Sequence, residues 1–276
     1  MRRHPWNTAF EWSAPSSVPT TLTGEEVDAY DRHGYVVRPG MIDGDTLAGV
    51  IGECDAFEAE VDAGLRQLPD GRLAIAEADA IVFAPHLASR SAVLGELARD
   101  PRVVGAVVDL LGPDVNLYWD QVVYKKPEKP RRFPWHQDNG YTFIEPQQYV
   151  TVWLALTDAT VDNGCPWVAP GVHRHGTLHH DYVDPLGFQC FTEPPSKAAA
   201  PVGAGGAVIF SSLTPHLTGP NTTEAVRKAY ILQYAPVGAE LLEGDPAQGP
   251  PTGRRRCDDP VNQFPVARNG HRVPTE

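Results

Sequence analysis

The spacing of the apolar residues changes once along this chain, and that change limits the folds open to it. Before about residue 112 the apolar residues recur at helical intervals, most clearly between residues 47 and 61. Later they alternate with a period of two, first over 115–124 and again over 149–157. Helices followed by many strands predict a mainly β fold with flanking helices, built as a double-stranded β-helix (a jelly-roll, cupin-like barrel).

The individual elements have local signals as well. Thr23 is placed to cap a helix that ends at Gly34, and a second helix starts at Asp43 or Asp45. A third helix is predicted over 101–111, with Pro101 in its first turn. Short strands are predicted at 35–37, 166–168, 206–210 and 228–234.

Length and composition favour one domain. The chain has 276 residues, of which 42% are hydrophobic, and it shows neither an internal repeat nor an interior linker. We therefore expect a single domain over 1–276 with its core at about 22–236. An irregular arm precedes that core. The Pro-, Gly- and Arg-rich tail after about residue 238 is expected to be extended, wrapping the barrel or partly disordered.

Charge and cysteine content restrict the partners. A formal net charge of −12 argues against nucleic acid, and no apolar run approaches the ~20 residues needed to cross a membrane. The basic start is not followed by the apolar segment of a secretory signal. The four cysteines are widely spaced, without a C-x-x-C pair. We expect a cytoplasmic protein that acts on a small molecule.

The most informative motif is His136-Gln137-Asp138. On an extended strand, residues two apart point to the same side, so the imidazole and the carboxylate converge. With His216 they form a 2-His-1-carboxylate set, the ligand pattern of non-haem Fe(II) oxygenases. Arg227 follows, and its planar guanidinium suits a carboxylate, for which the far end of 2-oxoglutarate is the candidate. His216 and Arg227 both lie beside predicted strands, which would aim them rigidly.

These motifs, in this order, resemble the phytanoyl-CoA dioxygenase family of Fe(II)/2-oxoglutarate oxygenases. The resemblance covers about residues 22–236. Its most specific parts are Trp135-His136-Gln137-Asp138, Trp153-Leu154-Ala155-Leu156, Asn163-Gly164-Cys165, Pro170-Gly171-Val172-His173-Arg174, His216, Asn221 and Arg227.

The resemblance implies a site for each cofactor. His136, Asp138 and His216 would hold Fe(II), and Arg227 would bind the distal carboxylate of 2-oxoglutarate, with O₂ as the oxidant. Trp153 would form a wall of the cosubstrate pocket, and Thr218 would add a hydrogen bond to the cosubstrate. The family's halogenating relatives replace the carboxylate ligand by a small residue. Asp138 is intact, so hydroxylation or a related oxidation is expected.

The substrate class stays open between three readings. We favour a dioxygenase that hydroxylates a small organic molecule, such as an intermediate of specialised metabolism. The alternatives are an acyl-CoA hydroxylase of the same family and a barrel that binds metal or ligand without redox chemistry. A basic stretch precedes the motif, and it is either a solvated hairpin loop or a patch for an anionic substrate. It consists of Lys125, Lys126, Lys129, Arg131 and Arg132.

The remaining candidates concern the substrate pocket. The long polar segment from His173 to about Pro195 is expected to form one wall and to be mobile. Its histidines (173, 175, 179 and 180) are interpreted as part of a solvated lid rather than a second metal site. Parity allows only one of Gln121 and Tyr124 to face the pocket, and both are expected to be ordinary sheet residues. We also expect at least one of Asn139, Tyr141 and Phe143 to contact substrate. The basic run 254–256 is expected to decorate a mobile tail.

Overall fold

The computed structural model describes residues 1–15, 18–127 and 133–274. Four α-helices lie in the first 111 residues of the described chain: α1 (Gly24–His33), α2 (Gly44–Leu65), α3 (Ala92–Ala98) and α4 (Pro101–Leu111). The predicted capping of α1 is confirmed, since Thr23 and Glu26 form a reciprocal capping box. Asp43 caps α2. The sequence pattern missed α3, a short helix capped by Ser91.

Ten strands form the large sheet. Its main path runs β1 (Tyr35–Arg38), β12 (Ala207–Ser211), β7 (Val150–Ala155), β14 (Arg227–Pro236), β5 (Val115–Lys125), β4 (Ile81–Pro85), β3 (Ala76–Glu77) and β2 (Arg72–Leu73). The strands β17 (Pro265–Arg268) and β18 (His271–Arg272) join it beside β5. All described pairings are antiparallel, so the sheet is a twisted antiparallel layer with one face available for a core.

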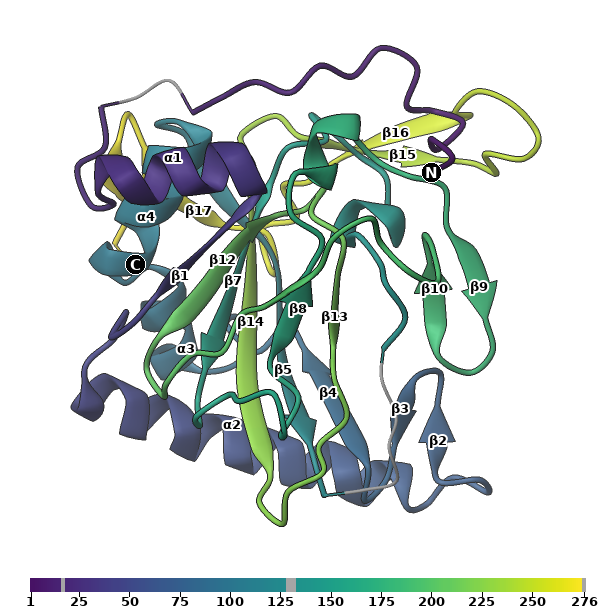
Figure 1. The fold of residues 1–276 in the computed structure, drawn as a ribbon. Coiled ribbons are helices and arrows are strands. Elements are labelled where there is room, and N and C mark those ends of the chain that lie inside the picture. Colours follow the sequence, from purple (N-terminus) through teal and green to yellow (C-terminus); the bar gives the residue numbers. More distant parts are fainter. Residues whose placement is uncertain (16–17, 128–132, 275–276) are drawn as a thin grey trace.

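A smaller sheet lies opposite, in the order β11 (Ala198–Ala199), β8 (Pro166–Val168) and β13 (His216–Thr218). Two further groups extend the edges: β9 (Asp181–Val183) with β10 (Gly187–Gln189), and β6 (Ile144–Glu145) with β15 (Glu240–Glu243) and β16 (Gly253–Arg256). Figure 1 shows β8 and β13 to the right of the long strand β14. The predicted jelly roll is confirmed by these two facing sheets.

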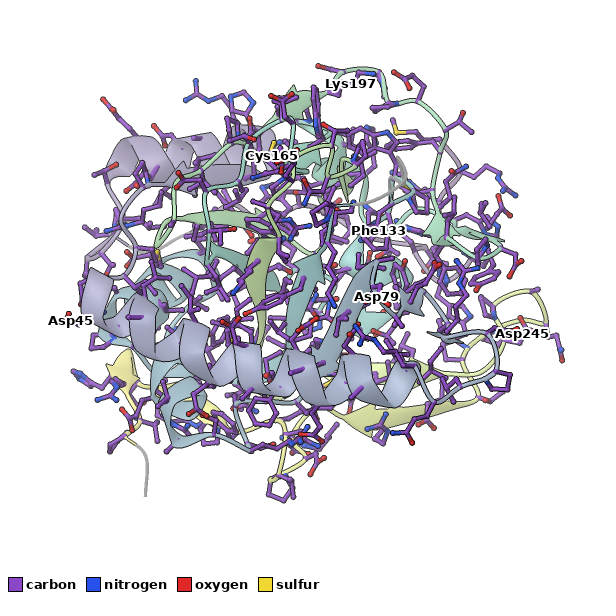
Figure 2. All side chains as sticks on the ribbon, turned by 90° about the horizontal axis from the view of Figure 1, so that it is seen from below. Asp45, Asp79, Phe133, Cys165, Lys197 and Asp245 are labelled. Carbon is purple, nitrogen blue, oxygen red and sulfur yellow. The ribbon has the colours of Figure 1, made fainter. Side chains whose placement is uncertain are left out.

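The helices cover one face of the large sheet and leave the other face to the smaller sheet. Apolar side chains from α2, α3 and α4 pack in one cluster with outward-facing residues of β5, β7 and β14. Figure 1 shows α2 below the sheet, and in the view from below it runs in front of the strands, beginning near Asp45 (Figure 2). Because the helices bury one face, side chains on the other face are free to line a cavity.

Strand register arranges that second face in rows. Thr151, Gln233 and Trp119 occupy one row across β7, β14 and β5. Two residues along, Trp153, Ile231 and Gln121 form the next row.

The rows continue with Ala155, Ala229 and Val123, and then reach Arg227, which pairs with Lys125. Each step of two residues advances about 7 Å along a strand. The register therefore sets the depth of each side chain in the cavity.

The C-terminal tail follows one of its two expected alternatives, but its basic run is not mobile decoration. It forms β15, β16, β17 and β18, and the side chains of Val266 and Ala267 are fully buried against the helices and β5. Its basic run, Arg254–Arg256, lies on β16 in ion pairs with Glu145, Glu240, Glu243 and Asp258. The tail is thus extended and wrapped on the fold, as one of the alternatives held. Among the described residues, no helix has both the length and the apolarity needed to cross a membrane.

Asp120 anchors the connection between β4 and α3. Its carboxylate, which is buried, accepts hydrogen bonds from the backbone N–H groups of Leu87 (2.7 Å) and Ala88 (3.0 Å) and from the hydroxyl of Tyr230 (2.6 Å). Asp120→Ala leaves three buried donors without an acceptor, so we expect it to lower the free energy of unfolding by about 3 kcal/mol or more. Urea denaturation measures this change.

Asp120→Asn keeps one acceptor oxygen and should lose less stability than the alanine variant. The exposed Asp70 provides the control, and Asp70→Asn should change the unfolding free energy by less than about 0.5 kcal/mol. A loss no larger than this in Asp120→Ala would contradict the anchoring role.

Candidate functional site

Three predicted ligands come together between the two sheets. One ligand atom each from His136, Asp138 and His216 lies within 4.8 Å of the others, and Nε2 of His216 is 3.6 Å from Oδ1 of Asp138. The backbones of His136 and His216 form an isolated antiparallel bridge through two hydrogen bonds, of 3.0 and 2.8 Å. Gln137 is extended, with φ −107° and ψ 144°, so His136 and Asp138 point to the same side as the motif predicts.

Backbone carbonyls orient both imidazoles. Nδ1 of His136 lies 2.9 Å from the carbonyl oxygen of Pro134, and Nδ1 of His216 lies 3.0 Å from that of Thr214. A carbonyl only accepts, so Nδ1 carries the proton and Nε2 keeps its lone pair. Both Nε2 atoms are therefore prepared to bind a metal ion, with the orienting hydrogen bond that metal-ligating histidines usually have.

Burial changes the proton affinity of these groups. Burial, and after it the nearby His216, lowers the pKa of His136 to about 4. Burial also lowers the pKa of His216 to about 4, so both imidazoles are neutral at neutral pH. Burial raises the pKa of Asp138, because the carboxylate loses its hydration. Two neutral imidazoles and a poorly solvated carboxylate fit a divalent cation, which would compensate the buried negative charge.

Two polar side chains of the large sheet hold Asp138. The hydroxyl of Thr151 donates to Oδ2 of Asp138, and the side chain of Gln233 also hydrogen-bonds to that carboxylate. Thr151 and Gln233 are register partners on β7 and β14. The sheet thus fixes the one anionic ligand of the set. The sequence contains a signal for these positions, because each is a polar residue on the inward face of an otherwise apolar strand.

Gln137 secures the turn between the ligands. Its side-chain amide, which is fully buried, donates to the carbonyl oxygens of Gly176 (3.0 Å) and Leu213 (2.6 Å) and accepts from the backbone N–H of Leu178 (2.6 Å). Its backbone N–H donates to Nε2 of His180, at 3.0 Å. The middle residue of the H-x-D motif is therefore a structural clamp.

A prepared anion site lies further along the same face. Arg227 is completely buried, and Nε and one terminal nitrogen of its guanidinium have no hydrogen-bond partner in the described ranges. Burial lowers its pKa to about 10, which leaves it cationic at neutral pH. The guanidinium lies 5.1 Å from the ring centroid of Trp153, and the buried hydroxyl of Thr218 has no partner within the described chain either. Buried donors left unpaired are costly, so the arrangement fits a bound carboxylate.

One cavity of about 520 Å³ connects these two sites. All six predicted site residues line it: His136, Asp138, Trp153, His216, Thr218 and Arg227. Register places Arg227 six residues from Gln233 on β14, which is about 20 Å of strand, but its side chain leans back toward Trp153 in the row next to Gln233. The cavity therefore brings together three residues that could hold a metal ion and a buried guanidinium with unpartnered donors.

The segment 173–195 does not form the expected wall. All its residues are described, and none of them lines the cavity. Its first part is packed rather than solvated: His173 is fully buried against Trp12, and His180 bonds to the backbone of Gln137. Within the described ranges, these histidines form no cluster that could hold a metal. The wall is formed instead by the hairpin of β2 and β3, with Leu73 and Ile75 on the cavity.

The residues after the metal motif divide as follows. Tyr141 lines the cavity, whereas Asn139 bonds to Thr177 and Ile144, and Phe143 packs against the N-terminal arm. On β5, Gln121 faces the cavity and Tyr124 lies in the helix-side core, as their parity requires.

The basic stretch before the motif is not a solvated hairpin where it is described. Lys125 is fully buried on β5, and its ammonium donates to the carbonyl of Gly219. Lys126 forms ion pairs with Glu58 (3.0 Å) and Asp62 (2.9 Å) of α2. The other members of the stretch, Lys129, Arg131 and Arg132, lie outside the described residues.

Comparison with known proteins gives a family match over most of the chain. Residues 30–229 match the family described as phytanoyl-CoA dioxygenase. A methylphosphonate hydroxylase of Gimesia maris is 31% identical over 242 residues, covering 82% of this chain and 84% of that protein. An ectoine dioxygenase of Bordetella bronchiseptica is 24% identical over 237 residues, covering 77% and 75%.

Solved structures share the fold. The carbocyclase SnoK of nogalamycin biosynthesis, which is described as non-haem and α-ketoglutarate dependent, aligns with a TM-score of 0.67 at 21% identity and covers 94% of this chain and 98% of that chain. EvdO2 of Micromonospora carbonacea var. aurantiaca, in complex with 2-oxoglutarate, aligns with a TM-score of 0.61 at 24% identity, covering 80% of this chain and 96% of that chain. At these identities the likeness shows the fold alone.

Thr151 provides a test of the hydrogen bonds that support Asp138. Thr151→Val removes the hydroxyl but keeps the shape, so we expect metal affinity to fall by about 10-fold or more, the usual effect of losing a group that orients a ligand. Thr151→Ser retains the hydroxyl and should bind nearly as wild type. Anaerobic titration with Fe(II) by calorimetry measures both. Equal affinity in the two variants would show that the hydroxyl does not support the ligand.

Proposed function

Because this chain belongs to the phytanoyl-CoA dioxygenase family, whose members are Fe(II)/2-oxoglutarate-dependent dioxygenases acting on small molecules, we propose that His136, Asp138 and His216 hold the iron. Arg227 and Thr218 bind the distal carboxylate of 2-oxoglutarate, and Trp153 forms the wall beside it. The observation that carries this assignment is the pair of unpartnered guanidinium nitrogens on a buried arginine, in the same cavity as the ligand set.

The protein's own contribution is positioning. Together, iron, 2-oxoglutarate and O₂ supply an oxidant for a substrate C–H bond, with 2-oxoglutarate converted to succinate and CO₂. Pro134 and Thr214 aim the two imidazoles through their carbonyls, and Thr151 and Gln233 hold Asp138. The guanidinium fork fixes the far end of the cosubstrate, and the apolar rows around it exclude water.

The reaction that we favour is hydroxylation of a small organic molecule, as in specialised metabolism. An acyl-CoA substrate would need cations for its phosphates. The described candidates are already neutralised by acidic partners: Lys126 by Glu58 and Asp62, and Arg254–Arg256 by residues of β6, β15 and the following turn. A non-redox barrel, the third alternative, gives no reason for a buried carboxylate clamp beside the metal set. Formation of succinate from 2-oxoglutarate with Fe(II) and O₂ distinguishes a dioxygenase from a non-redox barrel.

The whole chain of 276 residues acts as one catalytic domain in this proposal. Burial of Phe264, Val266 and Ala267 in the main core supports it, since the tail packs with the helices. The proposed compartment is the cytoplasm, because all four cysteines are free thiols. The net charge of −12 supports a small-molecule partner and no role for nucleic acid. The proposal also includes no membrane partner.

Removal of any one ligand should abolish tight metal binding. We expect His136→Ala, Asp138→Ala and His216→Ala each to bind Fe(II) at least about 100-fold more weakly and to form no succinate, while their circular dichroism stays that of the wild type. The exposed His271 supplies the control, and His271→Ala should behave as wild type. If two of the three ligand variants bound Fe(II) normally, the assignment would be wrong.

Arg227 should govern the cosubstrate rather than the metal. Leaving a buried carboxylate unpaired costs ~3–5 kcal/mol, so Arg227→Ala should weaken 2-oxoglutarate binding by at least about 100-fold without changing Fe(II) affinity. Arg227→Lys should recover part of this loss, because an ammonium lacks the planar fork. Anaerobic titration of the Fe(II)-loaded variants measures it, with Arg254→Ala as the control. Unchanged 2-oxoglutarate affinity in both Arg227 variants would contradict its role in cosubstrate binding.

A further inference from the structure

The cavity extends beyond the groups needed for iron and cosubstrate. Those groups lie on the rows from Arg227 to Thr151 and Gln233, on β13, and at His136 and Asp138 of the H-x-D motif. The remaining wall comes from β2, β3, β4 and the outer end of β5, and from the segment after the metal motif. The main members of this outer half are Leu73, Ala74, Ile75, Pro85, Trp119 and Tyr141.

The outer half carries no ionic side chain among the described residues. Among the described residues that line the entire cavity, the only ionisable side chains besides the two ligand histidines and the tyrosines are Asp138 and Arg227. Both already have a role in the proposed function. The polar groups of the outer half are neutral: Trp119 donates to the side-chain oxygen of Gln121 (3.3 Å), and Tyr118 shares a hydrogen bond with Thr142 (3.1 Å). A charged substrate entering this half would lose hydration without gaining a counter-charge.

The turn of the β2–β3 hairpin has a sequence that does not favour its backbone conformation. Its two-residue loop is Ala74-Ile75, and Ala74 has φ 53°, where such hairpins normally place glycine. Leu73 precedes the loop and lines the cavity, although 67% of its surface is exposed to solvent. Apolar residues at a tight turn break local sequence preference, which is expected at functional positions.

The hairpin is held in place as a wall. Arg72 and Glu77 form an ion pair of 2.7 Å across its base. At its tip, Ile75 abuts the β9–β10 hairpin, because a Cβ placed on Gly187 would lie 3.6 Å from Cγ2 of Ile75. Glycine is required at this contact, since its φ is 105° and the same Cβ would lie 2.6 Å from the hydroxyl oxygen of Tyr141. The two hairpins therefore meet at Ile75 and Gly187, and Figure 1 shows them one above the other at its right side.

We propose that the substrate of this enzyme is an uncharged, largely apolar organic molecule, selected by the β2–β3 hairpin through Leu73, Ala74 and Ile75. The inference rests on the proposed function. It restricts that function to neutral substrates and disfavours carboxylates, phosphonates and ammonium compounds. Hydrogen bonds with the substrate come from neutral amide and hydroxyl groups such as Gln121 and Thr142, which orient it without selecting charge.

Matched probes test this selection by binding, independently of turnover. Two pairs share a ring but differ in charge: acetophenone with benzoate, and 2-acetylnaphthalene with 2-naphthoate. Each is titrated by calorimetry into protein loaded anaerobically with Fe(II) and saturating 2-oxoglutarate, which keeps carboxylate probes from Arg227. We expect at least one neutral member to bind at least about 10-fold more tightly than its carboxylate partner, because the described residues of the outer half offer no cation.

Leu73→Arg places a cation on this wall at an exposed position, where the fold should tolerate it. It should shift the neutral-to-anionic affinity ratio by at least about 10-fold toward the carboxylate. Leu68→Arg is the control, because Leu68 is an exposed leucine just before the hairpin and does not line the cavity. It should leave the ratio unchanged.

The outcomes separate this inference from the proposed function. Fe(II) and 2-oxoglutarate binding are measured first on the same samples, and their failure would overturn the proposed function. If both bind but the carboxylates match or exceed the neutral probes, or if no neutral probe binds, the substrate class is wrong while the function stands. An unchanged ratio in Leu73→Arg would remove the hairpin from the selection.

Discussion

The antiparallel register of β7, β14 and β5 is the constraint on which the rest of this structure depends. It places Thr151 beside Gln233, and Trp153 beside Ile231, with their side chains on one face. The opposite face packs against the helices. A slip of one residue would turn Thr151, Gln233 and Trp153 from the cavity toward the helix layer. The same pairing that buries the core therefore sets the order of the chemical groups along the cavity.

The three candidate metal ligands are held in place mostly by groups outside the candidate set. Backbone carbonyls orient the imidazoles, an isolated backbone bridge ties His136 to His216 on β13, and the side chain of Gln137 is held by three hydrogen bonds. The segment that was expected to be a mobile lid supplies part of this clamp through Leu178 and His180. Its polarity reflects buried hydrogen bonding, so composition alone could not distinguish it from a solvated loop.

The cavity itself combines two chemically different halves. Around Arg227, burial leaves donors that require an anion, while the half bordered by the β2–β3 hairpin has apolar and neutral polar walls. Because charge is costly to bury without a partner, these halves would accept different molecules from the same solution. This division explains how a dianionic cosubstrate and a neutral substrate could bind beside one metal without competing.

Sequence alone predicted three of the four described helices, the long strands, and the candidate set of His136, Asp138, His216 and Arg227, because these depend on local periodicity, caps and a compact motif. Tertiary structure decided the rest. It showed that Lys125 is buried and that the segment 173–195 contacts Tyr141 through Phe188 without lining the cavity. It also showed that residues 253–272 form strands that pair with β15 and β5. Strand pairing between residues far apart in the sequence fixes these features. It also fixes the place of the 72–77 hairpin beside the cavity. The turn consists of apolar residues, and nothing in its local sequence indicates that it borders a cavity formed with distant strands.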